Sequence, residues 1–535
     1  MKMKKITSFI VLSLLIMALM GACTPQVETP EPQPPAVDTA TSAPTTPAAV
    51  VEAPVVEEGL GRGVVIATNA EAPSVAPARH VSEHGARINH LTNNGLFRTY
   101  YYDLSPIPDL VVEWAAISDT LFEFTLHQGV MFHNGEELTA YDVVASLAYV
   151  RNYPEARAAH GSVYSAEVVD RFTLRIDTGE PNALLFFDLA AQGNLVMPES
   201  LINAGHDFQA DPVGSGPFVF DEWRLGDSIS VVAFDNHFNP ERSANVESIT
   251  FRIIPEGSSR TIALEIGEVD FIVEVPFTDL HRLEDHQDIT VFMRQGVGYN
   301  FMLMNNDLPM FNNVYVRRAI DMAIDKEAAV LASLDGVATP AWANVPLVFP
   351  GSSSEGVRSF DPNGARALLA EHNIDPSTIN FEMLVFNEEG RRRAEVAQSN
   401  LADIGMTTTI SLIDLATYLS LTQFGDFEAG FSGFSAHSLL AFLRATSHID
   451  SIDAQNRSRM YNRELSDLID QAIATVDPDA RLAVLEQASR VANEHVGFIP
   501  MHQNMLVRAF NSNLAVPEIS AGGSDLYFNM IYWTD

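Results

Sequence analysis

The sequence predicts a globular α/β protein with more than one domain. At 535 residues the chain exceeds what one hydrophobic core usually supports, and its length alone suggests two to four domains. Hydrophobic residues make up 47% of the chain and aromatic residues 9%, which is typical of a folded protein and not of a disordered one. Segments with the two-residue period of strands alternate with segments of helical period, as an α/β fold requires.

The N-terminus has the features of an export signal. Lysines precede an apolar run from Ile10 to Met20, which is shorter than the roughly 18 residues needed to span a bilayer. The segment 19–23 (LMGAC) resembles a bacterial lipobox, which would make residues 1–22 a lipoprotein signal peptide and Cys23 the site of lipid attachment. An ordinary secretory signal with an incidental cysteine is the alternative. Because Cys23 is the single cysteine, no intrachain disulfide can form.

Residues 23–60 combine the anchor cysteine with a segment rich in proline, threonine and alanine, which cannot bury a core. Such a chain favours extended polyproline II, and at about 3 Å per residue it could hold a folded body up to roughly 100 Å from a membrane. We interpret it as a tether, with cell-wall attachment or glycosylation as the alternative. The sequence thus predicts an extracytoplasmic protein that is lipid-anchored to the bacterial cell membrane.

The formal charge of −37 argues against a nucleic-acid partner, because there is no basic stripe to neutralise phosphates. The charge alone would fit either an extracytoplasmic domain or the cytosolic enzyme of a halophile. The chain contains no GxxxxGK[ST] loop for nucleotide phosphates and no HExxH zinc motif. We therefore expect no cofactor.

The first half of the folded body opens with strands and a capped helix. Residues 63–67 (GVVIA) predict a buried strand, and residues 121–126 (LFEFTL) alternate with period two. His133 precedes an Asn-Gly hairpin dipeptide and is interpreted as a histidine that holds backbone, not as a catalytic residue or metal ligand. Thr139 is the expected cap of the next helix, and Asp142 is its capping-box partner.

The segment 211–236 (DPVGSGPFVFDEWRLGDSISVVAFDN), called here the hallmark segment, predicts a turn followed by a β-hairpin. Glycines and Pro217 form the turn, and Phe218 and Ile229 begin two alternating strands that are joined by the glycine-containing loop 224–227. The pattern PVGSGPFxFxxWxxG closely resembles that of extracytoplasmic solute-binding protein family 5, the substrate-binding lipoproteins of peptide- and nickel-type ABC transporters.

Further segments between residues 63 and 510 resemble the same family. In 316–326 (VRRAIDMAIDK) the apolar residues recur at helical spacing, and we expect Arg317 and Arg318 on the solvated side. Asp361 and Asp477 each precede a proline and should cap helices. The other matching segments are 108–114, 129–135, 260–270, 393–405, 456–469 and 498–501.

The resemblance implies a two-lobed periplasmic-binding-protein fold, type II-like, of the large cluster with an extra subdomain. Lobe 1 would comprise residues 61–295, with the subdomain inserted at about 98–190. Lobe 2 would comprise residues 296–503, and residues 504–535 would return to lobe 1. A solute that contacts both lobes would favour the closed form, which would then dock on the membrane permease subunits of an ABC importer. We expect a monomer without enzymatic activity.

The resemblance also implies a peptide or peptide-like solute, but the chain departs from the family at one position. In the peptide-binding members of the family, an aspartate in a W-x-[AG]-D pattern binds the α-amino group of the peptide. Here Phe434 stands at the tryptophan position and His437 at the aspartate, and histidine cannot supply a fixed negative charge at neutral pH. A different peptide pose, an oligosaccharide or a metal chelate therefore stays open. His437 could accept a hydrogen bond, ligate a chelate or face away from the cleft.

The candidate ligand-binding residues come from separate parts of the chain. Two follow the first strand, two lie on the expected crossover strand, and one lies in the turn-rich loop 338–346. The alternatives are a core position for Tyr299 and an exposed loop aromatic for Trp342. The full set is Asn94, Gly95, Tyr299, Asn300, Trp342, Phe434, Ser435, Ala436 and His437.

The sequence also bears on three other functions. His80, His84 and His90 cluster in sequence, but Arg79 and Arg87 oppose a cation, so no metal site is expected. Residues 433–437 (GFSAH) narrowly miss the GxSxG nucleophile elbow, which makes a hydrolase the less favoured alternative. A ligand sensor that works without a transporter would share every feature above.

Overall fold

The computed structural model describes residues 62–79, 82–102, 104–153, 162–191, 194–517, 519–520, 522 and 527–535. The predicted signal peptide, Cys23, the tether and His80 lie outside the described residues. No helix in the described part of the chain combines the length and apolar character of a membrane span.

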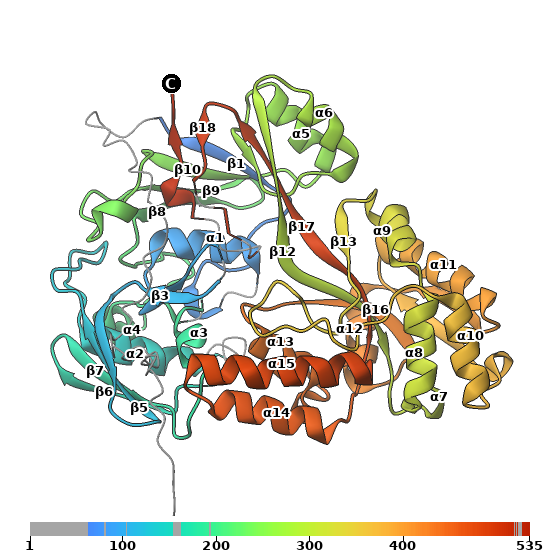
Figure 1. Ribbon diagram of the computed structural model, residues 1–535. Helices are drawn as coiled ribbons and strands as arrows, with labels where there is room; N and C mark the ends of the chain where they lie inside the picture. Colours follow the sequence, from blue (N-terminus) through green and yellow to red (C-terminus); the bar gives the residue numbers. More distant parts are fainter. Residues whose placement is uncertain are drawn as a thin grey trace, which may run out of the picture. The chain divides into compact units, whose positions relative to one another are not determined.

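One large mixed sheet runs through the folded body, in the order β15-β14-β16-β12-β17-β11-β1-β10-β9-β8, with β13 beside β17 (Figure 1). Strand β1 pairs in parallel with β10 and β11, whereas β8 and β9 form the antiparallel hairpin predicted from the hallmark segment. The strands are β1 Val64–Thr68, β8 Phe218–Arg224, β9 Ser228–Ala233, β10 Ser248–Ile253, β11 Phe271–Ile272, β12 Ile289–Met304, β13 Ala338–Pro340, β14 Asn380–Val385, β15 Thr407–Leu412, β16 Ala429–Ser435 and β17 Ile499–Asn511.

The long strands β12 and β17 lie side by side and connect the two halves of this sheet. Their antiparallel ladder is interrupted by a register shift between Gln295 and Tyr299. A Cβ on Gly298, within the interruption, would come 2.7 Å from Nδ2 of Asn504, so a side chain at this position would have to displace the amide of Asn504. Nε2 of Gln503 donates to the carbonyl oxygen of Gly296 at 2.7 Å and bridges the irregular segment.

A second, four-stranded sheet has the order β4-β5-β7-β6 and packs its own hydrophobic cluster, which includes Phe122, Phe124 and Leu147. The predicted capping box is present: Oδ2 of Asp142 accepts from the backbone N–H of Thr139 at 2.8 Å. The elements of this region are β2 Phe97–Thr99, β3 Pro106–Pro108, β4 Val111–Ala116, β5 Leu121–Leu126, α2 Ala140–Val150, β6 Ser165–Asp170, β7 Thr173–Asp177, α3 Leu185–Leu189 and α4 Glu199–Ala204.

Helices cover the remaining parts of the large sheet. Beside β1 and β11 lie α1 Glu83–Thr92, α5 Gly257–Glu265 and α6 Leu280–Glu284. Around β14–β16 lie α7 Pro309–Asn312, α8 Val314–Ala323, α9 Lys326–Leu334, α10 Pro362–Glu371, α11 Glu388–Asp403, α12 Leu415–Phe424 and α13 Leu439–Ser447. The helices α14 Arg463–Ala474 and α15 Pro478–His495 pack against each other and against α13. The C-terminal residues add the two-stranded sheet of β18 Leu514–Ala515 and β19 Tyr532–Trp533.

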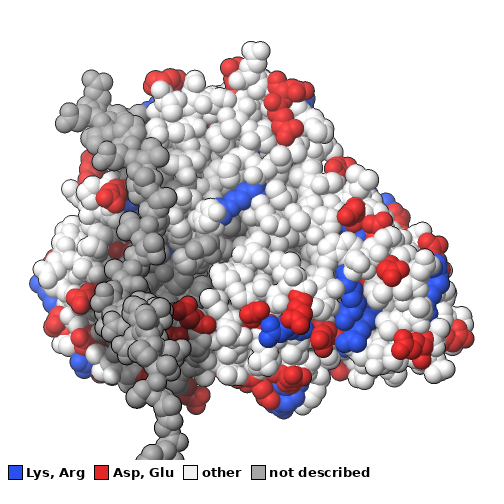
Figure 2. All heavy atoms as spheres, in the orientation of Figure 1, with Lys and Arg blue, Asp and Glu red and all other residues white. Residues whose placement is uncertain are grey.

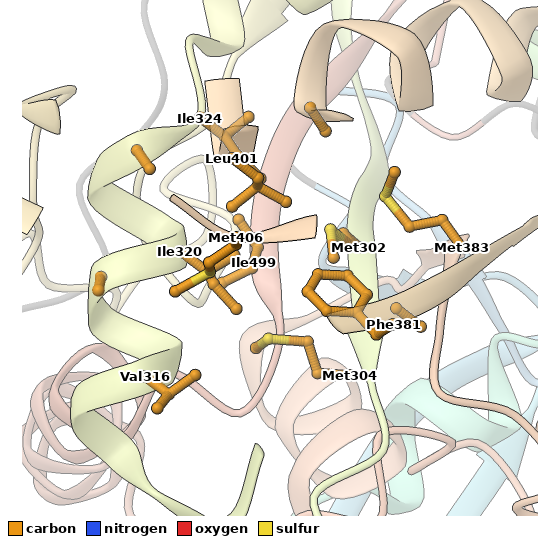
Figure 3. Close-up of a cluster of buried hydrophobic side chains, with 14 of the residues drawn as sticks. Met302, Met304, Val316, Ile320, Ile324, Phe381, Met383, Leu401, Met406 and Ile499 are labelled. Carbon is orange, nitrogen blue, oxygen red and sulfur yellow. The ribbon is translucent and has the colours of Figure 1, made fainter. Parts of the chain in front are cut away.

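The helices around β14–β16 begin and pack as the sequence predicts, with one correction. Asp361 and Asp477 cap α10 and α15 by accepting from the backbone N–H of residues 364 and 480. The apolar stripe of α8, including Val316 and Ile320, packs with Met302 and Phe381 in one core cluster (Figure 3). The predicted exposure of Arg317 is wrong, because this side chain is buried.

Arg317 is buried because its guanidinium binds backbone carbonyls at two helix ends. It donates to the carbonyl oxygens of Val496 at 2.8 Å and His495 at 2.7 Å, which end α15. It also donates to the carbonyl oxygens of Phe311 at 2.6 Å and Asn312 at 3.0 Å, which end α7. The last carbonyls of a helix have no partner within it, so a buried arginine beside them satisfies acceptors that water cannot reach.

Candidate functional site

Asn94 and Gly95 follow the C-terminal end of α1 and tie it to two distant segments. Nδ2 of Asn94 donates to Oδ2 of Asp109 at 3.0 Å, and its Oδ1 accepts from Oγ of Ser215, in the hallmark segment, at 3.1 Å. Gly95 forms an isolated β-bridge with Leu195. Both residues are buried and line a cavity of about 460 Å³, including space open to solvent. Arg98 and His237, which sequence reasoning did not select, line the same cavity.

The glycines of the hallmark segment allow it to pack directly against the end of α1. A Cβ on Gly214 would lie 2.1 Å from the carbonyl oxygen of Thr92, and one on Gly216 would lie 2.4 Å from that of Leu91. The backbone N–H of Gly216 donates to the carbonyl oxygen of Thr92 at 3.0 Å. These backbones can approach so closely only because both positions lack a side chain.

His133 holds this turn from the other side, as predicted. Its Nδ1 accepts from the backbone N–H of Gly214 at 3.4 Å, so its Nε2 carries the proton that it donates to the carbonyl oxygen of Gly216 at 3.0 Å. Burial lowers the pKa of His133 to about 4. The imidazole is therefore neutral at pH 7 and binds backbone only.

A second group of candidates lies where β12 pairs with β16. Tyr299 stands opposite Phe434 in this ladder. Tyr299 is 2% exposed, and its hydroxyl donates to the carbonyl oxygen of Ala343, so its ring belongs to the core cluster. Burial raises the pKa of this hydroxyl. Nδ2 of Asn300 donates to Oδ1 of Asn504 at 2.7 Å, from one long strand to the other.

The segment 434–437 ends β16 and leads toward α13. Phe434 is half-buried and its ring centroid lies 6.2 Å from that of Phe442. Ala436 is buried, whereas Ser435 and His437 are exposed. Exposed polar groups beside a half-buried aromatic ring suit the contact of a solute that is partly apolar.

Trp342 lies over a buried ion pair of Lys326 and Asp321, which no sequence motif marks. Nζ of Lys326 lies 4.4 Å from the Trp342 ring centroid and 2.6 Å from Oδ1 of Asp321. Both charged side chains are almost fully buried. Burial lowers the pKa of Lys326, and the carboxylate of Asp321 opposes that shift. Trp342 itself is half-buried and seals one side of the pair.

His84 is one of the three histidines that cluster in the sequence. His84 lies on α1, where its Nδ1 is 2.9 Å from Oγ1 of Thr68 and 3.1 Å from Nη1 of Arg87. Burial and the Arg87 guanidinium lower the pKa of His84. Among the described residues, no group of three or more histidine, cysteine, aspartate or glutamate side chains could hold a metal ion.

Comparison with known proteins connects this arrangement with solute binding. Residues 105–441 match the family described as bacterial extracellular solute-binding proteins, family 5 Middle. The chain is 26% identical to heme-binding protein A of Haemophilus influenzae over 434 residues. This alignment covers 74% of this chain and 78% of that protein. Over 430 residues the chain is 25% identical to glutathione-binding protein GsiB of Salmonella paratyphi A, which covers 76% of this chain and 83% of that protein.

Solved structures show the same fold. The ABC transporter-associated periplasmic binding protein DppA from Helicobacter pylori, in complex with the peptide STSA, matches with a TM-score of 0.75 and 22% identity. The match covers 89% of this chain and 99% of that chain. The structure of HbpA2 from Haemophilus parasuis matches with a TM-score of 0.78 and 22% identity, over 88% of this chain and 100% of that chain. The predicted two-lobed α/β fold is confirmed.

Proposed function

Since the chain belongs to the bacterial extracellular solute-binding proteins of family 5, we propose that it captures a peptide or peptide-like solute for the permease of an ABC importer. The match over residues 105–441 carries this proposal, because it spans both the second sheet and the β12–β16 ladder. A relative that binds glutathione and a fold neighbour in complex with a peptide support the peptide-like class. Family membership and the absence of a recognised catalytic motif support binding without catalysis.

The proposed solute lies between two lobes that close on it. Lobe 1 comprises residues 61–295 with its subdomain at about 98–190, lobe 2 comprises residues 296–503, and residues 504–535 return to lobe 1. Both lobe boundaries fall within β12 and β17, at or beside the register shift. An irregular, glycine-containing part of paired strands is a suitable hinge, because few residues there absorb the change in backbone angles.

The contacts proposed for the solute are mainly uncharged. Asn94 and Gly95 contribute from lobe 1, and Asn300, Trp342 and the segment 434–437 contribute from lobe 2. His437 replaces the carboxylate that holds an α-amino group in the family's peptide binders, which argues for a different peptide pose. Because a histidine stands at this position, an oligosaccharide or a metal chelate is the second candidate for the solute.

The proposed setting is the outer face of a bacterial cell membrane. Cys23 would carry the lipid, residues 23–60 would form the tether, and the body would act as a monomer. Mass spectrometry of membrane-extracted protein would detect acylated Cys23, and an unmodified cysteine would contradict the anchor. Permease and ATPase genes beside this one would support an importer, whereas their absence would favour a sensor.

Ligand screening by thermal unfolding tests the solute class. A solute that binds only the folded form raises its stability by RT ln(1 + [L]/Kd), about 2.7 kcal/mol at a hundredfold excess over Kd. Peptides of two to eight residues should therefore raise the unfolding midpoint in a saturable way. If all peptides fail while an oligosaccharide or a nickel chelate succeeds, the peptide assignment is wrong.

A further inference from the structure

We propose that the cavity beside Asn94 binds an anionic group, with the carboxylate of a solute as its physiological occupant. The cavity lies beyond the C-terminal end of α1, where β2, the hallmark segment and the C-terminal residues meet. Its empty volume of about 460 Å³ includes space open to solvent. It can therefore admit a group of a few atoms while the rest of a solute stays outside.

Two polar atoms in the lining have no hydrogen-bond partner. Nη1 of Arg98 and Nε2 of His237 are buried, and neither makes a hydrogen bond in the described part of the chain. His237 is only 9% exposed. Its other nitrogen, Nδ1, lies 3.1 Å from the carbonyl oxygen of Asn239, which can only accept, so Nδ1 is the donor of that pair and Nε2 of the neutral ring is an acceptor. Of these two atoms, Nη1 of Arg98 is therefore the one that can donate to an anion.

An occupant of this cavity would remove an energetic cost. A buried polar group without a partner destabilises the folded state, and more so when it is charged. Native proteins therefore leave few such groups, and each one needs an explanation. An acceptor placed against Nη1 of Arg98 would supply the missing hydrogen bond.

The charges around the cavity favour an anion. The guanidinium carbons of Arg98 and Arg242 lie 5.8 Å and 4.7 Å from the ring centroid of Tyr527, so one ring holds both cations at the lining. Among the described lining residues Asp109 is the one carboxylate, and Nδ2 of Asn94 donates to it at 3.0 Å. Guanidinium–carboxylate hydrogen bonds are among the strong ones in proteins.

The basic lining contrasts with the rest of the chain. The formal charge is −37, and acidic side chains are spread over the face drawn in Figure 2. A carboxylate held at Arg98 would orient a solute by its acidic end. Such a carboxylate anchor would replace the amino-group anchor that is missing at His437. The anion site thus deepens the proposed function, and its physiological role rests on that function.

Thermal unfolding with small anions tests the cavity directly. The full-length protein is titrated with acetate, inorganic phosphate and the neutral acetamide, with chloride added to keep the ionic strength constant. We expect a saturable rise of the midpoint with acetate or phosphate and none with acetamide. Arg98→Gln should weaken the anion at least tenfold, and Arg98→Lys should weaken it less. The matched control Arg224→Gln, at an exposed arginine of the hairpin, should bind like the wild type.

Three results would overturn the anion site: no saturable rise with either anion, an equal response to acetamide, or unchanged binding when Arg98 is replaced. If Arg98→Gln does not fold, Arg98→Lys and Arg242→Gln, at the other cation of the lining, provide the same comparison. Peptides without acidic side chains are compared with their C-terminal amides in parallel. Equal binding of both forms contradicts the carboxylate role and leaves the peptide function standing. Binding of acetate without binding of any peptide contradicts the peptide function and leaves the anion site standing.

Discussion

At the residue scale, the buried arginines of the described part of the chain have two roles: Arg87 and Arg393 pair with glutamates, whereas three others bind backbone carbonyls. Arg317 binds the ends of two helices, Nη1 of Arg260 donates to the carbonyl oxygen of Ile254 at 2.8 Å, and Nη1 of Arg508 donates to that of Val273 at 2.7 Å. Burial lowers the pKa of Arg317 and of Arg508 to about 10, which still leaves both charged at neutral pH. Their role is to satisfy carbonyl groups that the fold removes from water.

Replacing Arg317 by methionine should destabilise the protein by about 3 kcal/mol, because several buried carbonyls would lose their donor at once. Urea unfolding followed by circular dichroism measures the change. Arg318→Met is the matched control: Arg318 is more exposed, and within the described part of the chain its guanidinium donates to the one carbonyl oxygen of Glu494. That variant should lose less than about 1 kcal/mol. Equal losses in the two variants would contradict the role assigned to Arg317.

The stability contributed by His133 should fall in acid. Its pKa is about 4 in the folded protein and near the ordinary 6.5 when unfolded, so the unfolded chain binds more protons between these values. Stability is therefore lost as pH falls from about 6.5 to 4, by up to about 3 kcal/mol at 1.36 kcal/mol per pKa unit.

The comparison of His133→Asn with the wild type isolates this effect. Asp188, whose pKa burial raises to about 7, acts in the opposite direction, because the folded protein then binds more protons than the unfolded chain. Its contribution is common to both proteins and cancels in the difference. Urea midpoints at pH 4.5, 5.5, 6.5 and 7.5 should therefore converge for the two proteins as the pH falls. A constant difference would show that His133 stays protonated or deprotonated in both states.

At the element scale, the hallmark segment and α1 form one packed unit. Gly214→Ala should be strongly destabilising, by more than about 2 kcal/mol, because its Cβ would meet the backbone of Thr92 at 2.1 Å and backbone cannot move aside cheaply. Gly63→Ala is the control, since its nearest contact is the rotatable hydroxyl of Ser248. Differential scanning calorimetry should show a larger loss at position 214. A smaller loss there would mean that α1 and the hairpin can separate.

The elements that were predicted correctly are those specified by nearby residues. The capping box at Thr139, the aspartate caps before Pro362 and Pro478, and the loop between β8 and β9 all depend on residues within a few positions. The burial of Arg317 was missed because Val496, one of its acceptors, lies 179 residues away. Arg317 lies three residues before Ile320, at the edge of the apolar stripe of α8, and this position was the one sequence feature that indicated its burial.

The candidate site was predictable to a lesser degree. Position in the family pattern led to Asn94 and Gly95, which do line a cavity. The alternation of β12 would have allowed Tyr299 on either face, and the structure puts it in the core. Arg98 and His237 were not selected because they are 139 positions apart and meet only through the packing of α1, β2 and the hallmark segment.

At the scale of the whole molecule, β12 and β17 connect the two halves of the large sheet, so a change in their backbone conformation would affect both halves. Their ladder pairs Ile289 with Asn511 at one end and Met302 with Ile499 at the other. Regular paired strands resist bending, whereas the interruption between Gln295 and Tyr299 has fewer backbone hydrogen bonds to lose. The family resemblance, which is confirmed, implies that lobes close on solute, and we expect that motion to concentrate here.

A bound peptide should reduce the radius of gyration measured by small-angle X-ray scattering, because it shifts the population toward the closed form.

Gly298→Ala tests the hinge, because its Cβ would come 2.7 Å from Nδ2 of Asn504. The same amide accepts a hydrogen bond from Asn300 through its Oδ1. Crowding at this point should stiffen the segment, so the variant should bind peptide more weakly and contract less at saturation. Gly63→Ala, which lies outside β12 and β17 and has the rotatable hydroxyl of Ser248 as its nearest contact, controls for the substitution itself. Full contraction of Gly298→Ala with unchanged affinity would place the hinge elsewhere, and no contraction in the wild type would mean that the solute binds without closure.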